Sequence, residues 1–487
     1  MMRGLLVALA LGAATVLGFA PFGLFPIPFL TLALLVRQWA GATSAWRAAL
    51  LGMAWGLGFF LAGVSWVYVS LHEFGAMPAP LAALATLLFC AYLALFPALA
   101  GGLFRRWHEG SGQCVVRDAL LAASVWTLAE WLRGSLFTGF PWLALGYSQA
   151  PPSPLAGFAP LIGSLGLGFL VFFIAALLAS GWRRSVALAP LLALLVIGFG
   201  LRGAAWTEPV GEPLKVSLLQ GNIPQDLKWN PERLPLSLET YQTLALAAPA
   251  PLTVLPETAI PLFFDDIPRD LLHTLTTHGE ALMGVAVRTR EGGYTNGAVA
   301  IGRDLSVQAY SKRHLVPFGE FIPPGFGWFF GLVRIPMSDF TAGPAVQKPL
   351  LVAGQKVATS ICYEDLFGEE VLAFLPEATL LVNLSNTAWF GDSLAQPQHL
   401  QIAQLRALET GRPMLRATNT GMTAAIAPNG RVTAALDPFT SMALQVEVRG
   451  FQGRTPYSLS GDRPLLLLCV LIVIWITRRR RKAAKPS

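Results

Sequence analysis

Seven long apolar segments occupy residues 1–203, and they constrain the fold of this chain more than any other feature. A membrane-spanning helix needs about 20 predominantly apolar residues. In this stretch the acidic residues are only Glu73, Glu109, Asp118 and Glu130, far fewer than a soluble protein carries. We therefore predict an integral membrane protein, with spans near 4–20, 23–37, 48–70, 79–102, 118–135, 156–181 and 185–203, and an eighth at 464–477.

Basic residues fall in every second gap between these segments, which predicts the orientation of the chain. The positive-inside rule puts such gaps, and here both termini, on the cytoplasmic face. The gap between the seventh and eighth spans then lies outside, which in a bacterium with two membranes is the periplasm. The first segment resembles a secretory signal peptide, but the spans that follow favour an uncleaved anchor. The basic residues that set this orientation are Arg3, Arg37, Arg47, Arg105, Arg106, Arg117, Arg183, Arg184 and the run 478–482.

The polarity of the sequence divides the chain into domains. We predict a seven-span membrane domain at 1–203, an exported catalytic domain at 204–463, the eighth span at 464–477 and a cytoplasmic basic tail at 478–487. The net charge is +7, but its densest basic run lies in the tail beside a span and is explained without a nucleic-acid partner. The expected partner of this half is the lipid bilayer.

In the exported domain, short β-rich runs alternate with helical stretches. This pattern predicts an α/β domain of about 260 residues whose sheet is covered by helices. Several predicted strands end in polar residues, and ligands gather at strand ends in layered α/β folds. The predicted strands are 214–219, 252–255, 281–287, 298–301, 357–361 and 380–384, and the predicted helices are 230–248, 266–278 and 395–411.

Cys362 follows a strand-like run and precedes Tyr363, Glu364 and Asp365, so the strand must end there. A buried cysteine in a strand is commonly a small core residue. A thiol at a sharp turn is instead placed to act as a nucleophile, where backbone N–H groups lower its pKa and stabilise an oxyanion. Because 204–463 contains no second cysteine, Cys362 forms no disulfide within the exported domain.

Two charged residues upstream complete a catalytic constellation. We expect Glu257 to accept the thiol proton as general base, and Lys312 to stabilise the oxyanion together with the Tyr363 N–H. We expect Glu320 and Glu364 to hold Lys312 and Glu257 in place, with a purely structural ion pair as the alternative for both. Singly, Glu257 also fits a helix N-terminus and Lys312 fits a solvated loop. His314 and His399 lie in polar stretches, and we expect no catalytic histidine.

Glu257, Lys312 and Cys362, in this order and these settings, resemble the Glu-Lys-Cys triad of the nitrilase superfamily. That resemblance implies an αββα sandwich for the exported domain. Flanking sequences resemble the apolipoprotein N-acyltransferase family, a membrane-embedded branch of this superfamily, over nearly the whole chain and its eight-span plan. They are 139–149, 220–229, 312–323, 383–391 and 412–421.

The resemblance implies a two-step acyl transfer. Cys362 takes an acyl chain from a phospholipid, typically the sn-1 chain of phosphatidylethanolamine, and forms a thioester. The thioester then acylates the α-amino group of the N-terminal S-diacylglyceryl-cysteine of an apolipoprotein. We expect no metal and no cofactor, and we expect the protein to act as a monomer.

Aromatic residues of the exported domain are candidates for the lipid entrance, because aromatic side chains favour the membrane interface. A place in the domain core is the alternative for each of them. Asn296, an amide at a predicted strand end, and Tyr363, next to the nucleophile, are further site candidates. The aromatic candidates are Trp229, Phe326, Trp328, Trp389 and Phe390.

Two other functions fit part of the sequence. A membrane-anchored nitrilase-type amidase uses the same triad and passes the acyl group to water, although one anchoring span suffices for it. A transporter or scaffold that only binds lipid or peptide needs ionisable residues inside its spans. Here Glu130 and Arg133 are almost the only ones, and they lie near a span end.

Overall fold

The computed structural model describes residues 1–108, 115–180, 185–228, 230–325, 327 and 339–483. The chain forms two compact units. The helical unit contains Met1–Tyr68, Pro80–Ala204 and Leu459–Ser487, and the α/β unit contains Val69–Ala79 and Ala205–Ser458. The short segment Val69–Ala79 therefore belongs to the α/β unit by its contacts, although it lies between two apolar helices in the sequence.

The helical unit is built from apolar helices. Among the described residues, three helical stretches are long and apolar enough to cross a membrane: Ala45–Gly63, Ala79–Trp107 and Pro154–Ala179. Met2–Gly18, Ile27–Gly41 and Leu188–Leu201 are apolar but shorter, so the eight-span count stays a prediction. The helices are α1 (Met2–Thr15), α2 (Ile27–Gly41), α3 (Ala45–Gly63), α4 (Trp66–Val69), α5 (Ala79–Trp107), α6 (Val115–Arg133), α7 (Ala159–Ala179), α8 (Ser185–Leu201) and α15 (Arg463–Ala483).

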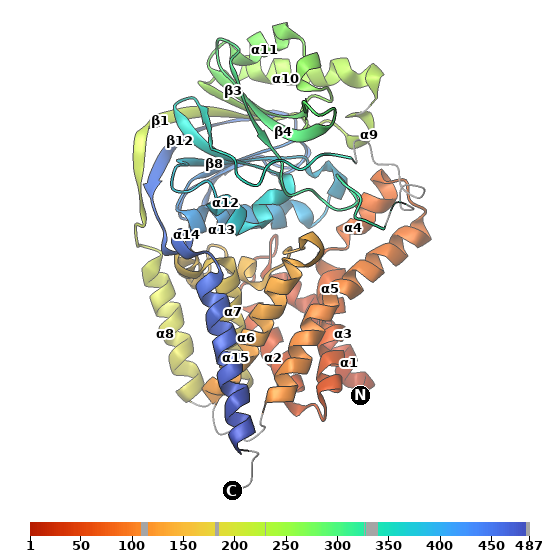
Figure 1. Ribbon diagram of the computed structural model, residues 1–487, viewed down its shortest axis with the longest axis vertical. Coiled ribbons are helices and arrows are strands. Elements are labelled where there is room, and N and C mark those ends of the chain that lie inside the picture. The colour runs from red at the N-terminus through yellow and green to blue at the C-terminus, as the bar shows by residue number, and fades with distance from the viewer. Residues whose placement is uncertain (109–114, 181–184, 229, 326, 328–338, 484–487) are drawn as a thin grey trace. The chain divides into compact units, whose positions relative to one another are not determined.

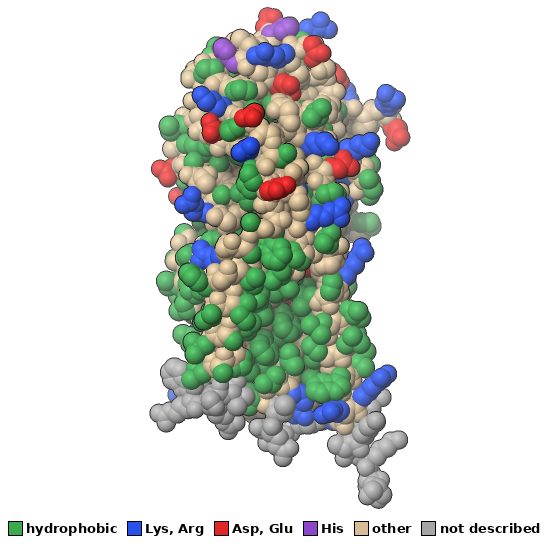
Figure 2. Space-filling model, turned by 90° about the vertical axis from the view of Figure 1, so that its left-hand side faces the viewer, with side chains coloured by type: hydrophobic (Ala, Val, Ile, Leu, Met, Phe, Trp, Pro, Cys, Tyr) green, Lys and Arg blue, Asp and Glu red, His purple; other side chains and the backbone are tan. Residues whose placement is uncertain are grey.

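Exposed apolar side chains cover the outside of this unit. Figure 2 shows one face on which hydrophobic side chains form a broad continuous surface. Leu192, Val196 and Phe199 of α8 and Leu467 and Leu471 of α15 are each more than half exposed. A surface of this kind is stable in lipid and not in water, which agrees with the composition of the sequence.

The predicted segment 48–70 is not one continuous helix. α3 ends at Gly63, because Val64 leaves the helical region with φ −130° and ψ 20°, and α4 begins at Trp66. Hydropathy does not detect such a break, since both sides of it are equally apolar.

Glu130 and Arg133, the ionisable pair near the end of α6, are buried and hold a loop in place. Their charged groups lie 3.6 Å apart. Arg133 donates to the carbonyl oxygen of Trp142 at 2.7 Å, and Glu130 accepts from the Leu145 N–H at 3.0 Å. Both charged residues therefore connect α6 to the loop that follows it. This structural role is an alternative to a place in a transport pathway.

The α/β unit contains two six-stranded sheets. The first has the order β12-β1-β2-β3-β4-β5 and the second the order β11-β10-β9-β8-β7-β6. The first contains β1 (Thr207–Gln220), β2 (Leu252–Leu255), β3 (Glu280–Arg288), β4 (Tyr294–Ile301), β5 (Val307–Ser311) and β12 (Met442–Gly453). The second contains β6 (Leu350–Val352), β7 (Gln355–Ile361), β8 (Leu380–Ser385), β9 (Met414–Thr418), β10 (Ala424–Ile426) and β11 (Val432–Ala435).

Helices cover the outer faces of both sheets, which gives four layers (Figure 1). α10 (Leu234–Ala247) and α11 (Arg269–Thr276) pack on the first sheet, and α12 (Gly368–Leu372) and α13 (Ala395–Thr410) pack on the second. α9 (Gln225–Lys228) and α14 (Pro456–Ser460) are short. A third apolar cluster, which includes Val254, Leu282, Val357, Val382 and Leu415, lies between the sheets. The predicted αββα sandwich is therefore confirmed.

Parallel strands bring the polar strand ends together. β1, β2 and β3 are parallel neighbours in one sheet, and β7, β8 and β9 are parallel neighbours in the other. Glu257 follows β2, Cys362 follows β7 and Asn386 follows β8. Within each sheet the carboxyl ends of parallel strands share one edge, and the Asn386 N–H donates to Glu257 at 2.8 Å, so the edges of the two sheets meet although 129 positions separate these residues.

Candidate active site

Cys362 occupies a strained turn at the end of β7. Its φ is 52°, a left-handed conformation that is uncommon for residues other than glycine. The turn continues as a short 3₁₀ helix, Cys362–Leu366, which we call the elbow. Asn383 of β8 donates from Nδ2 to the Cys362 carbonyl oxygen at 3.1 Å and to Ser360 Oγ at 3.0 Å. The fold thus holds this thiol at an unusual backbone angle, as the sequence predicted for a nucleophile at a sharp turn.

Glu257 lies in the turn after β2 and is fixed at both carboxylate oxygens. Oε1 accepts from Asn296 Nδ2 at 2.7 Å, and Oε2 accepts from the Asn386 N–H at 2.8 Å. The carboxylate of Glu257 is buried and lies 3.6 Å from Lys312 Nζ. Two donors and a cation therefore orient this carboxylate in one position.

Lys312 follows β5 and is 1% exposed, so its charge depends on protein partners. Nζ lies 2.9 Å from Glu320 Oε1 and 2.8 Å from Glu320 Oε2. Burial alone would lower the pKa of this ammonium, but the carboxylates of Glu320 and Glu257 outweigh burial and raise the pKa. Lys312 consequently stays cationic and is a suitable group to stabilise an oxyanion.

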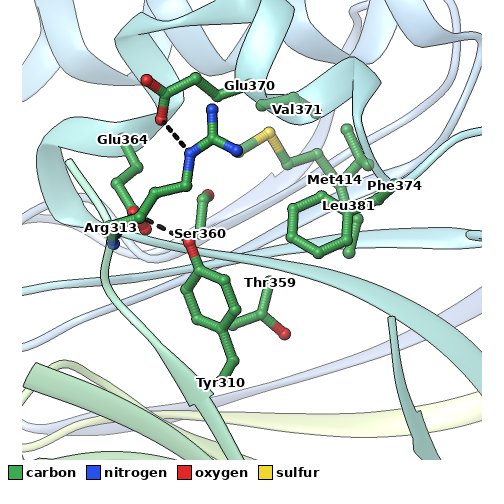
Figure 3. A pocket seen from close by; sticks show the side chains of 11 residues that line it. Tyr310, Arg313, Thr359, Ser360, Glu364, Glu370, Val371, Phe374, Leu381 and Met414 are labelled. Atoms are coloured by element: carbon green, nitrogen blue, oxygen red, sulfur yellow. Dashed lines mark hydrogen bonds and ion pairs between the residues drawn. The ribbon is translucent and has the colours of Figure 1, made fainter. Parts of the chain in front are cut away.

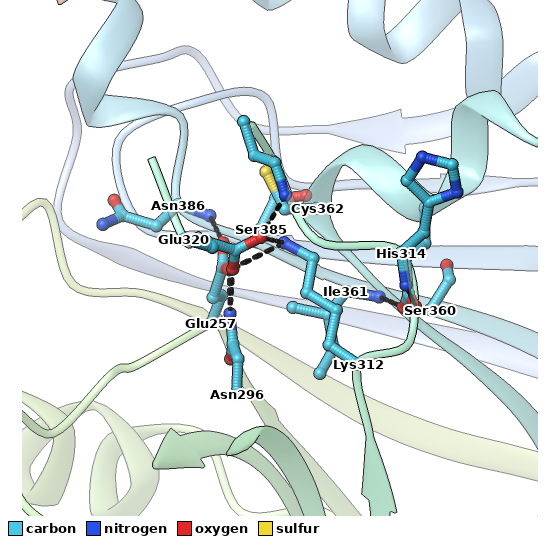
Figure 4. Close-up of polar contacts among 12 residues, drawn as sticks. Glu257, Asn296, Lys312, His314, Glu320, Ser360, Ile361, Cys362, Ser385 and Asn386 are labelled. Atoms are coloured by element: carbon cyan, nitrogen blue, oxygen red, sulfur yellow. Dashed lines mark hydrogen bonds and ion pairs between the residues drawn. The ribbon is translucent and has the colours of Figure 1, made fainter. Parts of the chain in front are cut away.

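Asn296 connects the two carboxylates. Its Nδ2 donates to Glu257 Oε1 and to Glu320 Oε1, both at 2.7 Å. Figure 4 shows Asn296, Glu257, Glu320 and the amino end of Lys312 gathered beside Cys362. The backbone N–H of Lys312 also donates to the Asn296 carbonyl at 2.8 Å, which extends the antiparallel pairing of β4 with β5 by one residue. The amide thereby sets the spacing between the predicted base and the predicted cation.

The thiol of Cys362 is protonated at rest. Burial is the largest cause that raises its pKa, Glu257 raises it further, and Lys312 lowers it by less. The net pKa of this thiol is thus raised and not lowered as we expected, because the loss of hydration in a buried turn is its largest cause. Such a thiol needs a base that takes its proton during the attack, and Glu257 is the predicted base.

Glu364 ties the elbow to the chain that carries Lys312. Its carboxylate accepts from the Ile361 N–H at 2.7 Å, the Arg313 N–H at 2.8 Å and the Tyr310 hydroxyl at 2.8 Å. These donors come from β7, from β5 and from the chain just after β5. Figure 3 shows Glu364 with Tyr310 and Arg313 around a small pocket whose far side is lined by Phe374, Leu381 and Met414. Replacing Glu364 would loosen two catalytic segments at once.

The stability of the protein should depend on pH through Glu364. Burial raises its pKa to about 7, although Lys312 and the donors just described lower it. The folded state then holds a proton that the unfolded state releases, so the free energy of unfolding falls as pH rises from about 4.5 to about 7. The contribution is about 3 kcal/mol at most.

Thermal unfolding of the full chain in detergent micelles measures this effect. Wild type should lose stability relative to Glu364→Gln as the pH rises through that window, because glutamine does not titrate. Parallel curves for the two proteins would show that Glu364 does not titrate there.

Several predicted substrate-binding residues lie outside the described residues, namely Trp229, Phe326 and Trp328. Trp389 and Phe390 are half-buried in a short 3₁₀ helix, Thr387–Phe390, that follows Asn386. Trp389 contacts the segment Val69–Ala79 of the same unit: its ring lies 6.0 Å from that of Phe74, and its carbonyl accepts from Ser70 Oγ at 2.7 Å. Tyr363 is buried beside Phe367, with ring centroids 5.3 Å apart.

Sequence reasoning missed two residues of the site. Tyr310, which binds Glu364, was not predicted because β5 has three exposed residues and a weak strand pattern. Lys228 is buried, and its Nζ lies 3.4 Å from the Glu257 carbonyl oxygen. Burial lowers the pKa of Lys228 to about 8, against the charge of Glu257. Lys228 could have been proposed from the sequence because it directly precedes Trp229, a predicted substrate-binding residue.

Among the described residues, no group of three or more histidine, cysteine, aspartate and glutamate side chains is arranged to hold a metal ion. The polar groups around Cys362 are instead paired with one another.

Known protein families match both parts of the chain. Residues 11–177 match the family described as apolipoprotein N-acyltransferase N-terminal domain, and residues 215–451 match carbon-nitrogen hydrolase. An apolipoprotein N-acyltransferase of Nitrosomonas europaea is 51% identical over 481 residues, covering 96% of each chain. One of Ralstonia nicotianae is 46% identical, covering 98% of this chain and 94% of the relative.

Solved structures also resemble part of this chain. A CN-hydrolase superfamily protein of Xanthomonas campestris covers 49% of this chain and 91% of its own, with 17% identity and a TM-score of 0.37.

Proposed function

This chain belongs to the apolipoprotein N-acyltransferase family, and on that premise we propose that it transfers a phospholipid acyl chain through a Cys362 thioester to an apolipoprotein. The observation that carries the proposal is a buried thiol on a strained elbow beside the Glu257–Lys312–Glu320 cluster. A thioester divides a difficult exchange of ester for amide into two easier steps. The apolar helices of the other unit support lipid substrates.

In the first step, Cys362 Sγ attacks the ester carbonyl carbon of the phospholipid, with the sn-1 chain of phosphatidylethanolamine as the proposed donor. The S–H proton passes to Glu257, and Lys312 with the Tyr363 N–H stabilises the oxyanion. When the C–O bond breaks, the leaving alkoxide takes the proton from Glu257. The products are an S-acyl enzyme and a lysophospholipid.

In the second step, the α-amino group of an N-terminal S-diacylglyceryl-cysteine attacks the thioester carbonyl. Glu257 accepts a proton from the attacking nitrogen, and the C–S bond breaks. That proton then returns to the sulfur, which restores the resting thiol. The product is a triacylated lipoprotein, and the two half-reactions share one oxyanion site.

We further propose how the protein is placed in the cell. It crosses the bacterial inner membrane eight times, its catalytic domain faces the periplasm, and it acts as a monomer. The arginine distribution supports this orientation, and the broad apolar surface of the helical unit supports insertion in a bilayer (Figure 2). We also propose that Trp389 and Phe390 contribute to the route by which lipid reaches Cys362.

Intact-mass spectrometry of the purified full chain tests the proposal. Incubation with phosphatidylethanolamine should add one acyl mass to Cys362, and hydroxylamine should remove it because thioesters are hydroxylamine-labile. A diacylated lipopeptide should then discharge the adduct onto its α-amine. Release as free fatty acid alone would favour the amidase-type hydrolase, and an adduct on another residue would overturn the assignment of the nucleophile.

Gly284 of β3 offers a test of how accurately Glu257 must be placed. A Cβ there would lie 2.5 Å from Glu257 Cα and 2.7 Å from the Pro256 carbonyl oxygen, so Gly284→Ala must move the backbone that carries the base. We expect acyl-adduct formation to slow by about 10²-fold. Gly41→Ala is the control, because a Cβ at Gly41 meets nothing within 4 Å. An unchanged rate would mean that Glu257 tolerates displacement.

A further inference from the structure

Three buried ionisable residues lie behind the elbow and have no part in the mechanism above. Asp365 is in the elbow, His399 is on α13 and Arg416 is on β9. Asp365 Oδ1 lies 2.7 Å from His399 Nε2, and Oδ2 lies 2.9 Å from an Arg416 terminal nitrogen. Each side chain is at most 1% exposed. Charges so deep in a protein are costly unless they are paired, so their retention calls for a reason.

The three residues connect the elbow to two elements that pack beneath it. Asp365 lies three residues after Cys362, within the same 3₁₀ helix. The backbone of Cys362 is a further hydrogen-bonding contact of His399. Burial and the neighbouring Arg416 lower the pKa of His399, and its Nε2 lies at hydrogen-bonding distance from Asp365 Oδ1. Both oxygens of Asp365 are thus held from outside the elbow.

We propose that Asp365, His399 and Arg416 are positioning residues for the nucleophile: Asp365 anchors the elbow, and the Arg416 guanidinium cancels the negative charge that this anchor brings near the sulfur. The assignment rests on Cys362 being the nucleophile of the proposed function. It explains how Cys362 can form a thiolate although the negative charge of Asp365 lies only three residues away.

The charges around the thiol make this compensation necessary. Beyond burial, Glu257, Glu320 and Asp365 all oppose a negative sulfur, whereas Lys312 favours it. Arg416 is a second cation that interacts electrostatically with Cys362. It lies on β9 of the second sheet, whereas Lys312 follows β5 of the first. Burial lowers the pKa of His399, which disfavours a positive charge on its ring, and Glu364 is a carboxyl group that carries none. Without Arg416, Asp365 would be an unopposed like charge.

Alkylation of Cys362 by iodoacetamide measures this effect independently of acyl transfer. Cys362 is followed by site-resolved mass spectrometry of the full chain, from about pH 6.5 to about pH 9, for Arg416→Gln, Asp365→Asn and the double variant. Arg416→Gln should slow alkylation by about 10-fold or more, and Asp365→Asn should speed it. The double variant, which removes both charges, should return to within about threefold of wild type. The rate of acyl-adduct formation from phosphatidylethanolamine should change in the same order.

The double variant separates charge compensation from a purely structural role, because it has lost the ion pair as completely as either single variant. If it stays as slow as Arg416→Gln, the cluster serves only folding and the proposal fails. If Arg416→Gln does not fold, the isosteric Asp365→Asn decides, and alkylation that is unchanged or slower overturns the proposal. Arg406→Gln is the matched control, since Arg406 and Glu409 form another buried pair on α13 at 2.9 Å. It should lower thermal stability and leave alkylation unchanged.

A missing acyl adduct with the expected alkylation pattern would reject the proposed acyl transfer and keep the role of the cluster. A normal acyl adduct, with alkylation rates that do not differ among the variants, would keep the proposed acyl transfer and reject the role of the cluster.

Discussion

Cys362→Ala should abolish the acyl adduct and reduce lipopeptide acylation on the order of 10⁴-fold or more, because no other group at the site can form the thioester. The remaining polar groups bind to one another around the missing sulfur: Asn296 bridges Glu257 and Glu320, and Lys312 pairs with Glu320. The fold should therefore survive, since the substitution removes one buried sulfur from a short turn. Intact-mass spectrometry and thermal unfolding measure both results.

Two other cysteines provide controls for this experiment. Cys90 and Cys469 are buried and free in the helical unit, so Cys90→Ala and Cys469→Ala should keep the adduct. Cys362→Ser keeps the shape of the side chain but replaces the thiol by a much weaker acid, and it should also fail to acylate. Transfer that persists in Cys362→Ala would mean direct attack of the amine on the phospholipid, and the two-step mechanism would be discarded.

Much of the site was predictable because each residue follows an apolar run. Glu257 follows β2 and Cys362 follows β7; both runs are short and β-rich, β2 is fully buried, and in β7 only Lys356 is exposed. Ligands gather at strand ends in layered α/β folds, so a base and a thiol at two such ends predict one site from the sequence alone. Lys312 was predicted from its place in a turn-rich stretch together with a base and a thiol, not from a strand end, because β5 is mostly exposed and has a weak strand pattern.

The supporting contacts were less predictable, because they depend on which elements become neighbours in space. Asp365 meets His399 and Arg416 only when α13 packs on the second sheet beside β9. His399 lies in a polar stretch of sequence that indicates an exposed helix, yet its side chain is fully buried. Partners separated by 34 and 51 positions leave no local pattern in the sequence. Charged residues usually indicate exposed positions, so a buried ion pair is not recognised as part of the core.

Lys312→Met should give the second large effect, a loss of both stability and acyl-adduct formation. Lys312 is the cation that Glu320 binds at 2.8 Å and that Glu257 faces at 3.6 Å. Methionine fills a similar volume but leaves Glu320 without the cation that binds it, while Asn296 still bridges it to Glu257. Removal of one partner of a buried ion pair costs about 3–5 kcal/mol. Loss of an oxyanion donor should slow adduct formation by about 10²–10³-fold, measured by intact-mass spectrometry.

A second substitution separates the two effects of Lys312. In Lys312→Met with Glu320→Gln, the carboxylate that the lysine binds most closely is also neutral, so much of the lost thermal stability should return. The rate of adduct formation should stay low, because an amide and a thioether cannot replace a cation beside the oxyanion. Lys215→Met, at an exposed position of β1, controls for the loss of a lysine as such. If the double variant regains the rate as well as the stability, Lys312 acts only by holding Glu320 and Glu257, and the oxyanion must be stabilised by backbone N–H groups alone.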